Sequence, residues 1–123
     1  MNIGFLTIHV RDIAASIDFY EKILGMKVTR RFSPGPGMEI VFLSDGSGGT
    51  VEFIRSENDK MYSGEGLSLG FYTDDMDKII AHLKAHNVPV LSGPAVTPDG
   101  TKLLSARDIN GLELGFVQMP PKK

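Results

Sequence analysis

Apolar positions near the start of the chain change from the pattern of a strand to the spacing of a helix. Residues 3–10 are apolar and β-prone, which predicts a strand. Asp12 then occupies the N-cap position of a helix whose apolar side chains recur in steps of three and four. These side chains belong to Ile13, Ile17, Tyr20 and Leu24. Gly25 follows as a helix stop, and residues 26–32 have the composition of a half-buried strand.

The same order of elements occurs again about sixty residues later. Residues 66–72 form an apolar strand segment, and Asp74 and Asp75 stand at the cap of a second helix. The apolar face of this helix consists of Ile79, Ile80 and Leu83. Asn87 stands where Gly25 stood, and Pro89 prevents further helix. The repeat is one of pattern, and it predicts a duplicated βαβββ module.

The remaining strands are separated by clusters of glycine and proline. The first half has a breaker cluster at residues 33–37, which predicts a turn or loop over Pro34 to Gly37, and a hairpin connection at residues 44–49. The second half has a break at Gly93 and Pro94 after a short strand. The further strands are expected at residues 38–43, 50–55, 90–91, 101–106 and 112–119. Two helices and about eight strands predict an α+β fold.

Length and composition predict one cooperative domain. The chain has 123 residues, of which 41% are hydrophobic, so it can build a sizeable core. We expect a single domain over residues 1–123, with module 1 at about residues 1–56, a polar linker at 57–65 and module 2 at about 66–119. Met61 and Tyr62 in this linker are expected either to fold over a pocket or to dock on a partner chain.

Charge and cysteine content exclude several classes of function. The formal net charge of −2 gives no basic field for nucleic acid or for an anionic membrane surface. The chain has no cysteine, which excludes disulfides, thiolate nucleophiles and thiolate metal sites. No apolar segment approaches the length of a membrane span, and no basic segment precedes the first strand. We therefore expect a cytoplasmic protein without nucleic-acid or membrane partners.

Three motifs together resemble the vicinal oxygen chelate superfamily. They are VRDIAASIDFYEKILGM at residues 10–26, GPAVTPDG at residues 93–100 and DING at residues 108–111. The superfamily includes glyoxalase I, extradiol dioxygenases, and fosfomycin and bleomycin resistance proteins. The resemblance covers nearly the whole chain, and it implies two βαβββ modules of curved mixed sheets that form a cleft. Because this fold hosts several chemistries and non-catalytic binders, function must be argued from the site.

The resemblance also indicates where a metal would be bound. The metalloenzymes of this superfamily take one ligand from the first and one from the last strand of each module. These positions correspond here to Phe5, Glu52, Ser68 and Gly115, and one offset of 63 residues links both pairs. Only Glu52 has a metal-binding side chain, whereas catalytic sites of this kind use about three or more protein ligands. We therefore expect no metal and no cofactor; the alternative is that a strand bulge brings Glu113 into the position of Gly115.

The same alignment predicts an organic ligand pocket. Its expected ligand-binding residues are Phe5, Thr7, His9, Phe42, Glu52, Ser68 and Tyr72. Alternation places Phe5, Thr7 and His9 on one strand face, which the resemblance makes the concave one. Ser68 and Gly70 are small and leave volume on the corresponding strand of module 2.

Each polar candidate also has a structural interpretation. His9 either contacts a ligand or acts in proton transfer, or it is a rim histidine satisfied by backbone and water. Relatives that use glutathione tend to carry a basic residue at this position, so His9 also argues against glutathione. Tyr72 either stacks on a planar ligand or is a core aromatic with its hydroxyl at the rim. His82 and His86, spaced i and i+4, fit a solvated helix surface better than a metal site.

Glu52 is the candidate with the most direct chemistry. It either faces the ligand, as a base or as a partner for a cationic group, or it is an inward polar residue satisfied by a neighbour such as His9 or Arg107. The superfamily aims this position at the cavity, which favours the ligand-facing role. Glu52 is therefore the one candidate catalytic residue.

These observations predict a protein similar to the metal-free bleomycin resistance proteins, which would bind and sequester a small, partly aromatic or apolar molecule. The alternative is a glyoxalase-like lyase or isomerase with Glu52 as base, and metal dependence would then need unexpected ligands. A third alternative is an interaction module. We expect a homodimer, because relatives often form their clefts between modules of different chains and open module edges favour pairing.

Overall fold

The computed structural model describes residues 1–57 and 60–121 and divides the chain into two compact units. Unit 1 comprises Met1–Tyr62, and unit 2 comprises Ser63–Lys123. Asn58 and Asp59, which belong to the linker predicted at residues 57–65, lie outside the described residues. The expectation of one cooperative domain over the whole chain stays a prediction.

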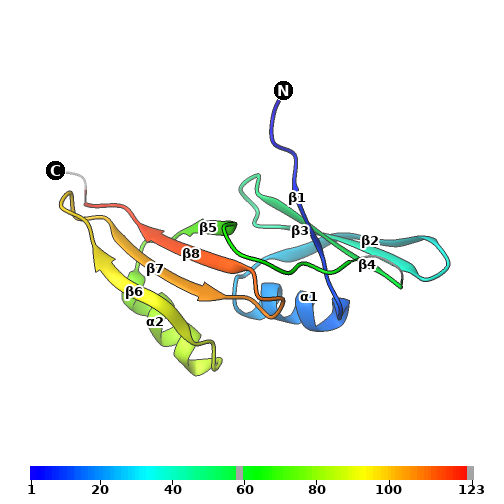
Figure 1. Ribbon diagram of the computed structural model, residues 1–123. Coiled ribbons are helices and arrows are strands. Elements are labelled where there is room, and N and C mark those ends of the chain that lie inside the picture. Colours follow the sequence, from blue (N-terminus) through cyan, green and yellow to red (C-terminus); the bar gives the residue numbers. More distant parts are fainter. Residues whose placement is uncertain (58–59, 122–123) are drawn as a thin grey trace. The chain divides into compact units, whose positions relative to one another are not determined.

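Unit 1 is a four-stranded mixed sheet with one helix (Figure 1). Its elements are β1 (Leu6–His9), α1 (Ile13–Lys22), β2 (Lys27–Gly35), β3 (Met38–Ser44) and β4 (Thr50–Ser56). The strand order is β1-β4-β3-β2, with β1 parallel to β4 and the other pairs antiparallel. The helix α1 carries the chain from β1 at one edge of the sheet to β2 at the other, and β3 and β4 then return, so that β4 lies parallel beside β1.

Unit 2 repeats this topology. Its elements are β5 (Ser68–Tyr72), α2 (Met76–Ala85), β6 (Val90–Val96), β7 (Lys102–Arg107) and β8 (Glu113–Gln118). The strand order is β5-β8-β7-β6, again with the first and last strands parallel. Both helices have ten residues, and α2 starts 63 residues after α1. The α+β fold of two βαβββ modules is confirmed.

Capping fixes both helix ends. The Asp12 side chain accepts a hydrogen bond from the Ala15 N–H at 3.0 Å, and Asp75 does the same for Lys78 at 3.2 Å. Of the two aspartates expected before α2, Asp75 is therefore the cap. After the helices, Gly25 and Asn87 adopt positive φ values of 71° and 58°. No helix in residues 1–57 and 60–121 combines the length and the apolar character needed to cross a membrane.

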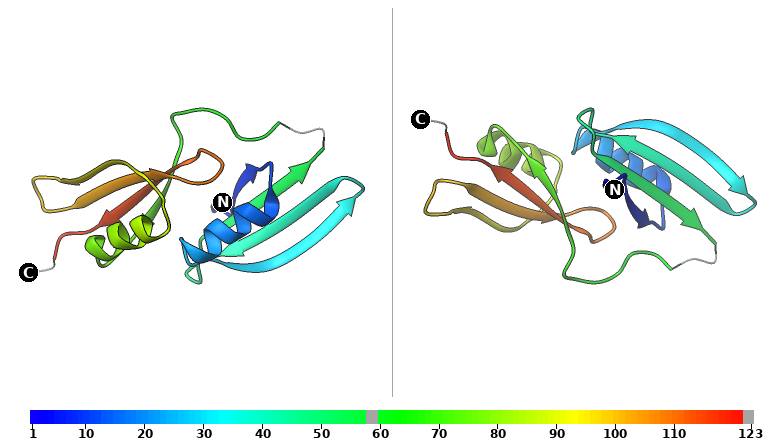
Figure 2. Two further views of the ribbon diagram at one scale, coloured as in Figure 1. Left: turned by 90° about the horizontal axis from the view of Figure 1, so that it is seen from below. Right: turned by 90° about the horizontal axis from the view of Figure 1, so that it is seen from above.

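Each helix covers one face of its own sheet (Figure 2). In unit 1 the Tyr20 ring meets Phe53 edge to face, with ring centroids 4.9 Å apart, and both side chains are fully buried. The other buried strand residues of this face are Ile8, Val41, Leu43 and Val51. In unit 2 the buried apolar set includes Met76, Leu83, Leu104, Leu114 and Phe116. The opposite face of each sheet, which we call the open face, is not covered by the helix of its own unit.

Two predicted breaks fall on edge strands, and in both cases the strand extends further than expected. Residues 33–37 were expected to form a turn or loop; the turn is present at Pro36 and Gly37, but β2 continues to Gly35, which pairs with Met38 across it. Gly37 has the positive φ of 74° that such a turn requires. β2 lies at the edge of its sheet, where a proline such as Pro34 removes no ladder hydrogen bond.

The break expected at Gly93 and Pro94 is wrong. β6 runs without interruption from Val90 to Val96, with a register shift between Ser92 and Ala95 that accommodates the irregular residues. β6 is also an edge strand, so only one neighbouring strand has to tolerate the shift.

The same aspartate turn closes the last hairpin of each unit. The Asp45 side chain accepts hydrogen bonds from the N–H groups of Ser47 and Gly49 at 2.7 and 2.9 Å. The Asp108 side chain accepts from Asn110 and Leu112 at 2.8 and 2.9 Å, 63 residues later. Asp45 is exposed, whereas Asp108 is only 6% exposed.

This difference in burial predicts different costs for one substitution. Asp108→Ala leaves two N–H groups without their acceptor in a buried turn, so we expect the free energy of unfolding to fall by about 2 kcal/mol. Asp45→Ala exposes the equivalent groups to water and should cost less than about 1 kcal/mol. Urea denaturation followed by circular dichroism measures both values, and equal losses would contradict the importance of burial in these turns.

Candidate functional site

Strand register collects the candidate residues of unit 1 on its open face. Thr7 pairs with Glu52, Glu52 with Phe42, and Phe42 with Arg30, so these side chains form one row across the four strands. The next row on the same face consists of His9, Ile54, Ile40 and Phe32. All five residues predicted from this module, Phe5, Thr7, His9, Phe42 and Glu52, lie on this face.

Glu52 is a buried carboxylate with a single hydrogen bond from its own unit. The residue is 8% exposed, and its Oε1 accepts a hydrogen bond from the Thr7 hydroxyl at 2.5 Å. His9, one of the neighbours considered from the sequence, does not supply this bond, and the involvement of Arg107, which belongs to unit 2, stays a prediction. Within the described residues of unit 1, no second hydrogen bond or ion pair of this carboxylate is found. A charge buried to this extent normally has further partners, so its second oxygen is available to a bound molecule.

Two aromatic rings lie on the same sheet face as this carboxylate. Phe5 meets Phe42 edge to face, with ring centroids 5.6 Å apart, and Phe5 remains 53% exposed. Phe42 lies directly beside Glu52 in the register of β3 and β4. The open face therefore offers an apolar surface next to a carboxylate, which is the composition of many small-molecule sites.

Linker residues lie along the free edge of β1. The Tyr62 N–H donates to the His9 carbonyl oxygen at 2.8 Å, and Arg11 Nε lies 3.3 Å from the Met61 sulfur. The sequence left open whether Met61 and Tyr62 fold back or dock on another chain. The structure shows both residues folded back onto their own unit, Tyr62 at β1 and Met61 at Arg11, two residues after it.

The open face of unit 2 carries a row of small side chains, with Glu113 and Arg107 in the neighbouring row beside Ser68. Ser68 and Tyr72 share this face, and Tyr72 is 83% exposed. Between them, one row across the sheet consists of Gly70, Gly115, Ser105 and Ser92. A Cβ added at Gly70 would meet no atom within 4 Å. The volume expected from small residues is therefore present on this face.

Arg30 and Phe32 are site residues that sequence reasoning missed. A bulge at Thr29 shifts the register between Val28 and Arg30 and so places Arg30 beside Phe42. The Thr29 hydroxyl donates to the Phe42 carbonyl oxygen at 3.3 Å. The alternation of side chains along β2 does not reveal the bulge. The signal available in the sequence was the adjacent pair Arg30 and Arg31, because neighbouring residues on a strand point to opposite faces and one guanidinium must lie on each.

The residues at the four metal-ligand positions do not fit a metal ion. Glu52 is the one donor, because Phe5, Ser68 and Gly115 offer no carboxylate or imidazole. Glu113 stays in register with Arg107 and no bulge moves it, so the alternative considered for it is wrong. Across the described ranges 1–57 and 60–121, no group of three or more His, Cys, Asp or Glu residues has metal-binding geometry.

His82 and His86 form a ring contact on α2. Their ring centroids are 4.6 Å apart at an interplanar angle of 65°, which is edge-to-face packing of two imidazoles. His86 is exposed and His82 is half-buried, consistent with the helix surface expected from the sequence.

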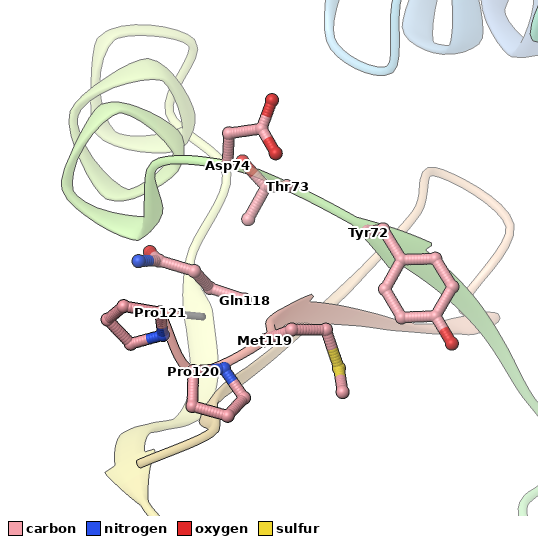
Figure 3. Close-up of a pocket in the computed structure, with 7 residues that line it drawn as sticks. All are labelled: Tyr72, Thr73, Asp74, Gln118, Met119, Pro120 and Pro121. Atoms are coloured by element: carbon pink, nitrogen blue, oxygen red, sulfur yellow. The ribbon is translucent and has the colours of Figure 1, made fainter. Parts of the chain in front are cut away.

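Unit 2 also contains a pocket of about 390 Å³ at the end of β5 (Figure 3). It is lined by Tyr72, Thr73 and Asp74 on one side and by residues 118–121 on the other. The Gln118 side chain, which lines it, accepts a hydrogen bond from the Met76 N–H at 2.6 Å and so covers the start of α2. Tyr72 is the predicted ligand residue that contributes to this pocket.

Sequence comparison finds relatives over most of the chain. The model of the Glyoxalase/Bleomycin resistance protein/Dioxygenase superfamily matches residues 2–116. The uncharacterized protein YwbC of Bacillus subtilis (strain 168) is 30% identical over 116 residues, which cover 90% of this chain and 92% of that protein.

Solved structures share the fold. A glyoxalase family protein from Bacillus cereus superposes with a TM-score of 0.83 at 15% identity, covering 98% of this chain and 95% of the other. Trypanothione-dependent glyoxalase I from Leishmania major gives 0.80 at 22% identity, covering 96% and 86%. TnmS3, an antibiotic binding protein from Streptomyces sp. CB03234, gives 0.78 at 25% identity, covering 97% and 96%. The homodimer and the cytoplasmic location expected from the sequence stay predictions.

The surroundings of Glu52 predict that its charge lowers the stability of the protein. Glu52→Gln keeps the shape of the side chain and an acceptor for Thr7 but removes a poorly compensated buried charge. We expect the free energy of unfolding to rise by about 1 kcal/mol. Chemical denaturation at neutral pH measures this change, and a clear loss of stability would show that Glu52 has a structural role.

Proposed function

The chain belongs to the Glyoxalase/Bleomycin resistance protein/Dioxygenase superfamily, and we propose that within it this protein binds a small organic molecule without a metal ion. The ligand carries a protonated nitrogen and a flat apolar body, and it lies on the open face of unit 1. The biological role that follows from such binding is sequestration, as in resistance by capture of a toxic compound.

The proposal rests on the burial of Glu52 and on its hydrogen bonding. The carboxylate is buried to more than nine-tenths, yet within the described part of unit 1 its one protein partner is the Thr7 hydroxyl. A cationic nitrogen on the ligand supplies the missing partner in a charge-assisted hydrogen bond. The site thus selects for a hydrogen-bond donor that carries positive charge.

The apolar part of the ligand is recognised by aromatic rings. Phe5 and Phe42 already stand edge to face, and Phe5 exposes half of its surface, so a planar group can stack beside them without displacing the core. Ile40 and Ile54 extend the apolar surface in the next row. No group in this arrangement has to react, which fits a binding protein.

The comparisons support binding in a general way. TnmS3 is described as an antibiotic binding protein and is similar to this chain along almost its full length. The alternative, a lyase or isomerase, rests on the same buried carboxylate, because a general base also needs a free oxygen facing the substrate. Binding and turnover experiments separate these two possibilities.

Removing the Glu52 charge should weaken the binding of cationic ligands. In calorimetric titrations with a panel of biphenyl and naphthalene methylamines, we expect Glu52→Gln to weaken binding at least roughly tenfold, since a hydrogen bond to a charged group is lost. Glu39→Gln is the matched control: it makes the same charge change on the neighbouring strand, on the opposite face, where Glu39 pairs with Arg31.

Several outcomes would overturn the proposal. Equal losses in both variants would show a general charge effect in place of a site. A stoichiometric Ni²⁺, Zn²⁺, Mn²⁺ or Fe²⁺ that stabilises the protein in thermal shift and is lost in Glu52→Gln would contradict metal-free binding. Conversion of a bound compound, lost in the same variant, would establish the enzyme alternative.

The contacts predicted from unit 2, Ser68 and Tyr72, are tested with a steric probe between them. Gly70→Val adds a side chain into open space on a strand, so we expect stability to stay the same or to rise by a few tenths of a kcal/mol. If the ligand uses this face, its affinity falls at least roughly tenfold, because the added methyl groups fill the space it needs. Unchanged affinity in the folded variant would remove Ser68 and Tyr72 from the site.

A further inference from the structure

We infer that Arg30 is a second anchor on the open face of unit 1, which binds an anionic group of the same ligand. The inference rests on the proposed function, because it takes Glu52 as the anchor for the cationic group. It narrows the ligand to molecules that carry both charges, one at each end of a flat apolar body.

The register fixes the separation of the two anchors. Glu52 on β4, Phe42 on β3 and Arg30 on β2 are successive members of one row. Neighbouring strands are about 4.8 Å apart, so the two charged residues are separated by roughly 10 Å. Phe42 occupies the middle of this distance and provides the surface for the apolar part of the ligand.

The side chain of Arg30 is held in place by an aromatic ring and has no ion pair in the described part of the chain. Its guanidinium lies 4.4 Å from the centroid of the Phe32 ring, which holds the side chain against the open face. No ion pair of Arg30 is found in the described part of the chain, whereas its neighbour Arg31 pairs with Glu39 on the other side of the sheet. Two adjacent arginines thus have different roles, one neutralised within the protein and one directed to the open face.

The charges of this face are well separated. The titratable and charged side chains that the four strands direct to it are His9, Lys27, Arg30 and Glu52, with Lys27 in the neighbouring row opposite Ser44. Glu52 lies toward the β1 side and Arg30 on the edge strand β2, with aromatic and aliphatic residues between them. A ligand with only an acid meets the Glu52 charge without compensation, and one with only an amine leaves Arg30 unused. A planar guanidinium also matches the geometry of a carboxylate or phosphate better than an ammonium does.

The test uses matched biphenyl derivatives with para substituents. One carries an aminomethyl group, one a carboxylate, and one carries both at opposite ends, so that its charges are roughly 10 Å apart, two strand spacings. Affinities are measured by calorimetry for the wild type, Arg30→Gln and Arg31→Gln. Arg31→Gln is the control, because it makes the same charge change one residue away on the opposite face.

We expect the wild type to bind the zwitterion roughly fivefold more tightly than the amine, the size of one partly exposed ion pair. Arg30→Gln should remove this preference, so that the variant binds the zwitterion no more tightly than the amine, while Arg31→Gln keeps it. Equal affinity for amine and zwitterion in the wild type, or equal effects of both arginine variants, would overturn the role of Arg30.

The failure of this inference differs from a failure of the proposed function. If the amine binds in a manner that depends on Glu52 but the added carboxylate gives no gain, Arg30 is not an anchor and the cation site stands. If neither the amine nor the zwitterion binds, or if Glu52→Gln binds both as the wild type does, the proposed function fails and this inference with it.

Discussion

Each four-stranded sheet in this protein has one helix, and one helix covers one face. The helix face is filled by interlocking side chains such as Tyr20 and Phe53, and it accounts for the core of unit 1. The open face has no such cover within its own unit, so its residues are released from the demands of core packing. Polar and charged groups appear there, at Glu52 and Arg30, where a helix would have excluded them.

The two modules use the same scaffold and differ on their open faces. Helix starts, helix ends and the aspartate turns recur at one spacing of 63 residues, from Asp45 to Asp108 and from Ile13 to Met76. The open face of unit 1 combines aromatic rings with Glu52 and Arg30, whereas that of unit 2 has a row of glycine and serine between Tyr72 and the register pair of Glu113 and Arg107. The two modules therefore share the local features that fold them and differ in the side chains of their open faces.

Much of this organisation can be predicted from sequence because it depends on local chemistry. The cap at Asp12, the glycine after the helix at Gly25 and the buried face of Ile13, Ile17 and Tyr20 are confirmed. Leu24 was expected on this face as well, but α1 ends at Lys22. The end of β2 that was expected before Pro34 was wrong, because the tolerance of an edge strand for proline depends on which strand has only one neighbour. The position of Arg30 depends on a bulge at Thr29, which is set by pairing between strands and leaves no mark in the spacing of apolar residues.

The bulge at Thr29 has a consequence for the robustness of the site. Side chains alternate along a strand, so a shift of β2 by one residue would turn Arg30 away from the open face and bring Arg31 to it. A positive charge would thus remain on this face in either register. Phe32 would turn away together with Arg30. The guanidinium then on the open face, that of Arg31, would lack the ring that holds Arg30 in place. The two adjacent arginines therefore keep a positive charge on this face in either register of β2. The exact position of that charge depends on the bulge at Thr29.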